Sequence, residues 1–83
     1  MPQEIRVTSG PSHDGDGVPL TFACGRTVHR LAHATGPERI CGVWWEGRHK
    51  TRDYYDVEDE TGRRFWVFRV LETGKWYLHG EYE

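Results

Sequence analysis

The chain has little of the features that mark secreted, membrane-bound or nucleic-acid-coating proteins. It contains two cysteines and no apolar run as long as a membrane span, and its 11 Lys and Arg stand against 13 Asp and Glu, for a net charge of -2. A chain this close to neutral has no overall field that attracts nucleic acid or an anionic membrane. Its first residues also lack the apolar stretch of a secretory signal. We therefore expect a cytoplasmic protein with two reduced thiols and no membrane partner.

Aromatic residues, by contrast, are abundant. The 83 residues include four Trp, four Tyr and three Phe. A domain this short buries only roughly 60 to 65% of the surface that its unfolded chain exposes, so its core must be built from large side chains. We expect one small β domain over residues 1–83 that folds without a metal ion or a disulfide.

The N-terminal part of the sequence alternates between short strand patterns and turn residues. Apolar and polar residues alternate over Glu4–Thr8, which predicts a half-buried strand. Residues 9–18 are rich in Gly, Ser, Asp and Pro and predict a flexible loop. Pro19–Ala23 predicts a second strand, and Gly25 with Arg26 predicts the turn that follows it.

A third strand is predicted after this turn, with Val28 and Leu31 as its apolar anchors. Gly36-Pro37 is expected to stop it, because proline lacks the N–H of a strand ladder. Residues 38–47 are compatible with either a helical turn or a bent strand, since the run is too short for its periodicity to decide.

The C-terminal part predicts a three-stranded meander with strands at 52–58, 64–71 and 76–82. Both turns have the pattern Glu-Thr-Gly-basic, in Glu60-Thr61-Gly62-Arg63 and Glu72-Thr73-Gly74-Lys75. Glycine at that position supplies the positive φ of a type I turn with a G1 bulge. The fold class is therefore mainly β, a small antiparallel barrel or curled sheet of about five to six strands.

Aromatic side chains occur on both faces of this meander. Because side chains alternate across a strand, Phe65 and Val67 share one face and Trp66, Phe68 and Val70 share the other. One of the two faces is expected to form the core and the other a partly exposed surface, and the alternation alone leaves open which is which. Tyr55, Val57, Trp76 and Leu78 belong to the first set, with Phe65, and Tyr54, Tyr77 and His79 to the second, with Trp66.

The second set, with the neighbouring Trp pair and basic residues, is the candidate binding surface. Aromatic residues beside Arg suit a protein hot spot, and they equally suit the stacking of single-stranded nucleic acid. In a third interpretation, the N-terminal strands and the Trp44-Trp45 segment simply cover these aromatics. The candidate binding residues are Trp44, Trp45, Arg48, Lys50, Arg52, Tyr54, Arg64, Trp66, Tyr77 and His79.

No arrangement of residues predicts catalysis or a cofactor. Asp53 and Asp56 lie an odd number of positions apart on a strand, so their carboxylates face opposite sides and cannot share a substrate. The set Cys24, His29, His33 and Cys41 lacks the close ligand pairs of a zinc site. We predict a protein that is not an enzyme and that holds no metal and no cofactor.

Several ordered motifs resemble the C-terminal segment of ImuB-type proteins, which are polymerase-like members of the Y family involved in damage-induced mutagenesis in bacteria. The motifs are Gly36-Pro37-Glu38-Arg39-Ile40, Trp44-Trp45, Arg52-Asp53-Tyr54-Tyr55, Gly62-Arg63-Arg64-Phe65-Trp66-Val67-Phe68-Arg69 and Trp76-Tyr77-Leu78-His79-Gly80. The resemblance implies a non-catalytic adaptor in the DNA damage response or translesion synthesis, with a replication or repair protein as its partner. Single-stranded DNA is the alternative ligand.

Overall fold

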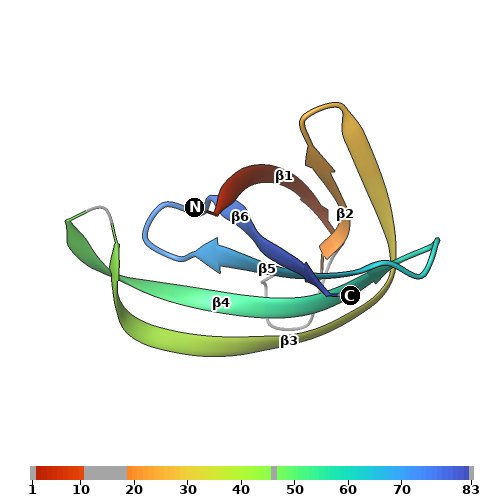
Figure 1. Ribbon diagram of the computed structural model, residues 1–83. Coiled ribbons are helices and arrows are strands. Elements are labelled where there is room, and N and C mark those ends of the chain that lie inside the picture. Colours follow the sequence, from red (N-terminus) through yellow and green to blue (C-terminus); the bar gives the residue numbers. More distant parts are fainter. Residues whose placement is uncertain (1, 11–18, 46, 83) are drawn as a thin grey trace.

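The computed structural model describes residues 2–10, 19–45 and 47–82, which form a closed antiparallel barrel (Figure 1). Its strands are β1 (Gln3–Ser9), β2 (Pro19–Cys24), β3 (Thr27–Trp45), β4 (Arg48–Asp59), β5 (Arg64–Val70) and β6 (Trp76–Tyr82). The predicted fold class is confirmed. Within these ranges no helix is long and apolar enough to cross a membrane.

Strand β1 closes the barrel because its two halves pair with different neighbours. Gln3–Ile5 pairs with β6, and Arg6–Ser9 pairs with β2. Figure 1 shows β1 as a strongly curved ribbon between these two strands. Ile5, at the change of partner, is 4% exposed and points into the interior.

The interior of the barrel is filled by one set of alternating side chains. The structure shows which face of the meander is the core, since Tyr55, Val57, Phe65 and Val67 pack there with Ile5 and Phe22. Phe22 is 1% exposed and Val57 0%. Partly buried side chains complete this core, namely Val7, Cys24, Leu31, Ala34, Trp76 and Leu78.

A second cluster lies on the opposite, outer side of β4, β5 and β6. Tyr54, Phe68 and Val70 are buried there, and Trp45, Trp66 and Tyr77 pack against them. The aromatics of the second face thus form a separate cluster on the outer side of the sheet. No described residue of β1 or β2 belongs to it, so the expectation that the N-terminal strands cover these aromatics is wrong. Those strands are used to close the barrel.

Strand β3 corrects two of our expectations. It does not stop at Gly36-Pro37 but continues to Trp45, and from Leu31 to Trp45 it pairs with β4. The pairing shifts register between Thr35 and Glu38, so Pro37 lies where no ladder N–H is required. Val28 is 63% exposed and therefore does not anchor the core.

The described residues between 38 and 45 form a bent strand, which resolves the two options left open by the sequence. Register shifts between Leu31 and His33, Thr35 and Glu38, and Ile40 and Val43 bend β3. Figure 1 shows the β3–β4 hairpin extending beyond β5. This extension positions Trp45 against the outer cluster.

The two turns of the meander have the predicted glycine conformation. Gly62 and Gly74 have φ angles of 92° and 75°. In the first turn the N–H of Gly62 donates to the carbonyl of Asp59, and in the second the N–H of Gly74 donates to that of Val70. Of the predicted loop over 9–18, Ser9 ends β1 and Gly10 follows it, while 11–18 lie outside the described residues.

Candidate binding face

The outer side of β3 to β6 carries a continuous aromatic surface, which we call the outer face. Phe68 lies at its centre and is 0% exposed. The Phe68 ring centroid is 5.1 Å from that of Tyr54, 5.4 Å from that of Tyr77 and 5.8 Å from that of Trp45. A buried floor of this kind holds the surrounding rings in fixed positions.

Trp66 and His79 form the exposed part of this aromatic surface. The Trp66 ring lies 4.8 Å from Tyr54 and 4.7 Å from His79. Trp66 is half-buried and His79 is exposed, so both present ring surface to solvent. Each is therefore available to a ligand without unfolding of the sheet.

Arg52 joins the β3–β4 hairpin to the outer cluster. Its guanidinium carbon lies 4.9 Å from the Trp45 ring centroid and 4.3 Å from that of Phe68. Its Nη1 donates to the hydroxyl of Tyr54 at 2.8 Å. Arg52 is only 9% exposed, and within the described ranges no ion pair involves it. The aromatic rings, through cation–π attraction, stabilise this charge.

One end of the outer face is basic. Side chains alternate along β4, so Arg48 and Lys50 project to the same side as Arg52. Trp45 is on this side as well, with its ring 4.7 Å from Tyr77. Trp44 is not, because it pairs with His49, whose ring lies 5.1 Å away, on the opposite side of the hairpin.

The other end of the outer face is acidic. Asp56 and Glu58 continue the same row of β4 beyond Tyr54. Arg64, the basic residue at this end, donates to Asp56 at 2.6 Å and lies 4.9 Å from the Tyr82 ring. The structure therefore brings together all the candidate binding residues except Trp44, and the row of side chains on β4 runs from basic at Arg48 to acidic at Glu58.

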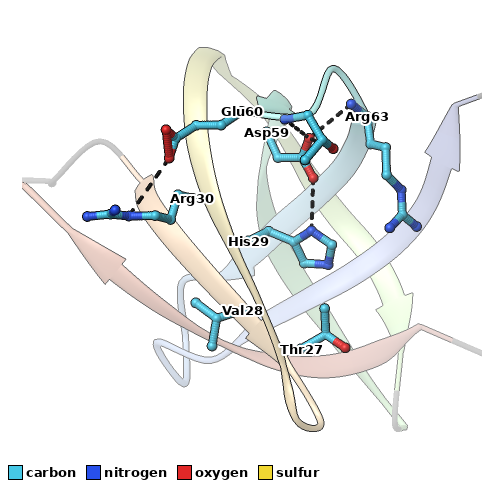
Figure 2. A pocket seen from close by; sticks show the side chains of 8 residues that line it. Thr27, Val28, His29, Arg30, Asp59, Glu60 and Arg63 are labelled. Atoms are coloured by element: carbon cyan, nitrogen blue, oxygen red, sulfur yellow. Dashed lines mark hydrogen bonds and ion pairs between the residues drawn. The ribbon is translucent and has the colours of Figure 1, made fainter.

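The sequence did not predict a buried His–Asp contact at the end of β4. Nδ1 of His29 lies 3.0 Å from Oδ2 of Asp59, which is 4% exposed. Figure 2 shows His29 pointing from β3 toward Asp59. Both residues line an open cavity of about 340 Å³. An ionised carboxylate has no proton to donate, so His29 is the donor. The two residues are 30 positions apart, and no local pattern joins them.

Asp59 also caps the β4–β5 turn. The hydroxyl of Thr61 donates to it at 2.6 Å, and the backbone N–H groups of Thr61 and Arg63 donate at 3.0 and 2.9 Å. These bonds, the Thr61 hydroxyl first, outweigh burial and hold the pKa of Asp59 well below its ordinary value of 3.8. Because the Thr61 hydroxyl is bonded to the carboxylate, it is not arranged as a nucleophile beside His29. The contact between His29 and Asp59 therefore belongs to the network that fixes the β4–β5 turn.

The carboxylates of Asp53 and Asp56 have separate partners, in line with their predicted separation. Asp53 is buried and accepts two bonds from Arg39, at 2.8 and 2.9 Å. Asp56 bonds to Arg64 on the outer face. Among the described residues no group of three or more His, Cys, Asp or Glu could hold a metal ion.

The fold and this surface define a small closed β barrel with an aromatic outer face of graded charge. Comparison with curated proteins gives a particular relative. The chain is 44% identical over 78 residues to the protein ImuB from two strains of Caulobacter vibrioides, an alignment covering 78% of this chain. It spans 17% of the length of ImuB. The resemblance predicted from the sequence motifs is confirmed.

Two further comparisons found no relative. No family model matches the chain, and no solved structure matches it. The similarity found is therefore to one segment of ImuB.

Proposed function

We propose that this chain is a non-catalytic binding module that acts in the bacterial DNA damage response or translesion synthesis through contacts with a replication or repair protein. The observation that carries the proposal is the outer face, where Trp66 and His79 present ring surface above a buried aromatic floor. Protein hot spots combine aromatic and arginine side chains in this way. The similarity to ImuB supplies the setting.

The chemistry of the buried polar groups supports a role without catalysis. The Asp59 carboxylate is occupied by donors from its own turn, and Asp53 by Arg39. Catalysis needs an acid, a base or a nucleophile that converges on a cleft with free bonding capacity. These carboxylates are used to hold strands together.

The proposal is tested by affinity capture from bacterial cells exposed to DNA damage, with three forms of the chain as bait. Trp66→Ala removes the exposed ring of the outer face, and Val28→Ser removes an exposed apolar side chain outside it. We expect the wild type and V28S to retain the same replication or repair protein and W66A to lose it. The proposal is contradicted if no such protein is retained, or if folded W66A retains it as well as the wild type.

Single-stranded DNA is a second candidate ligand, favoured by the basic end of the outer face. Arg48 and Lys50 lie in the same row as Arg52, next to Trp45. Titration with an oligothymidylate at low salt should then change tryptophan fluorescence, and Arg48→Gln should reduce the effect. With so few phosphate contacts, the salt dependence should be shallow. Unchanged fluorescence at low salt removes this candidate.

A further inference from the structure

A groove crosses the acidic end of the outer face from β3 to β6. Its walls and floor come from Thr35 and Glu38 on β3, Tyr54 and Asp56 on β4, Trp66 on β5 and Tyr82 on β6, and it encloses about 240 Å³. A second hollow of about 290 Å³ shares Thr35 and Asp56 with it and extends along the same strands. The two hollows are therefore neighbours on one surface.

The groove combines aromatic rings with the carboxylates of Glu38 and Asp56. Glu38 is exposed, and no ion pair involves it within the described ranges. Glu58, which is half-buried, lines the adjoining hollow and likewise has no ion pair within the described ranges. Asp56 is balanced by Arg64, so the surface keeps an excess of negative charge. Aromatic faces and free carboxylates both attract a guanidinium or an ammonium group.

The stacking of Arg64 shows how this surface holds a cation. Its guanidinium lies 4.9 Å from the Tyr82 ring and 2.6 Å from Asp56. Trp66 and Glu38 provide a second ring and a second carboxylate in the groove. Among the described residues, no Arg or Lys stacks on Trp66 or forms an ion pair with Glu38. The groove therefore has an unused site of the same chemistry.

Recognition of a partner's backbone is the competing way to use this region. From Leu31 to Trp45, β3 pairs only with β4 among the described strands, which leaves its other edge open. Register shifts and Pro37 interrupt that edge, however, and such features prevent strand addition. Side-chain recognition in the groove is therefore favoured over backbone pairing.

We infer that the groove between Glu38, Trp66 and Tyr82 binds an arginine or lysine side chain from an extended segment of a protein partner. The inference rests on the proposed function and names the chemistry of the partner. Charge complementarity selects the segment, because an acidic segment would be repelled by Glu38 and Glu58. A nucleic acid backbone would be repelled in the same way.

The test is nuclear magnetic resonance titration of the ¹⁵N-labelled full chain with blocked glycine-serine peptides. One peptide carries a central arginine, and its matched control carries citrulline, which has the same shape without the charge. We expect the arginine peptide, and not the citrulline peptide, to shift the amide of Glu38 and the indole N–H of Trp66. Equal shifts with both peptides, or shifts confined to Trp45 and Phe68, would overturn the inference.

Two variants that remove the same charge at different places test whether the Glu38 carboxylate binds the arginine side chain. Glu38→Gln should weaken binding of the arginine peptide by roughly twofold to fivefold. Glu60→Gln, which removes the same charge near Arg30 and outside the groove, should leave it unchanged. If both variants weakened binding equally, the loss would be explained by the net charge of the protein, and the assignment of the site to Glu38 would be refuted. Tyr82→Leu, at a residue 41% exposed, should weaken binding by roughly twofold to fivefold through loss of a ring face.

Two controls separate this inference from its alternatives. Spermidine carries the same ammonium chemistry without a peptide, and a larger shift with spermidine than with the arginine peptide would overturn the assignment to a protein. If the arginine peptide leaves the groove unshifted while a captured repair protein still shifts Trp66, the inference fails and the proposed function stands. If that protein shifts no residue of the outer face, both fail.

Discussion

Replacing Asp59 should destabilise the barrel far more than replacing another aspartate of the same strand. In Asp59→Ala, the hydroxyl and N–H of Thr61, the N–H of Arg63 and Nδ1 of His29 all lose their acceptor. A hydrogen bond to a charged group contributes roughly 1.5 to 3 kcal/mol. Thr61 and Arg63 are exposed, so water replaces part of this loss. Four such bonds would sum to at least about 6 kcal/mol, and with water compensating for part of the loss we expect a total cost of about 3 kcal/mol.

Asp56→Ala is the matched control, because Asp56 is on the same strand and also bonds to an arginine. Its side chain is 35% exposed and that of Arg64 is 52% exposed, so solvent screens the pair. The expected cost is below about 1 kcal/mol. Urea denaturation followed by tryptophan fluorescence measures both variants. For a domain of this size a loss of about 3 kcal/mol lowers the Tm by roughly 12 to 24 °C. Equal losses in the two variants would refute the assigned role of Asp59.

The pH dependence gives an independent check on the same residue. Because the pKa of Asp59 is depressed in the folded state, ionisation of Asp59 stabilises the fold above the ordinary pKa of 3.8. This contribution is lost as the pH falls below that value toward the folded pKa. The difference in stability between the wild type and Asp59→Asn should therefore be constant near neutral pH and shrink below about pH 4. A difference that grows on acidification would contradict this sign.

Two further substitutions test the outer face and β3. Arg52→Ala should lower the free energy of unfolding by about 2 kcal/mol, because the guanidinium is desolvated between two rings. Lys50→Ala on the same row should lower it by less than about 0.5 kcal/mol. Urea denaturation measures both variants, and similar losses would contradict the stabilising role of the Arg52 guanidinium. Gly36→Ala should lower the Tm strongly, since its φ is 135° and a Cβ there would lie 2.7 Å from the carbonyl oxygen of Tyr54. Gly80→Ala is the control, because a Cβ at Gly80 meets no atom within 4 Å. Equal Tm values for the two variants would show that β3 can move away from β4.

Local rules were sufficient to predict the meander and its two faces. The Glu-Thr-Gly-basic turns fix where β5 begins and where β6 begins, and glycine at positive φ is a local requirement. From those turns, the period of two places Phe65 and Phe68 on opposite faces without any knowledge of the barrel, and the closure of the barrel decides which face is the interior. The turns and the alternation of faces depend only on neighbours in the sequence.

The failures of prediction share one physical cause, which is tertiary pairing. Proline disfavours a regular ladder, but a register shift beside Pro37 removes the need for its N–H, and that shift depends on β4. The contact of His29 with Asp59 joins β3 to the β4–β5 turn across 30 positions. The packing of Trp45 on Phe68 likewise depends on how far the β3–β4 hairpin bends. None of these contacts has a local pattern.

The order of charges along β4 favours a protein over DNA as the proposed ligand of the whole outer face. The row begins with Arg48, Lys50 and Arg52 and ends, beyond Tyr54, with Asp56 and Glu58. Successive residues of such a row are roughly 7 Å apart, so a phosphate backbone laid along it would reach the acidic end within a few steps. A single-stranded nucleic acid could then use only the basic end. A protein segment can match both ends, with acidic side chains at the Arg48 end and basic ones in the groove, which is why the whole face fits a protein better than DNA.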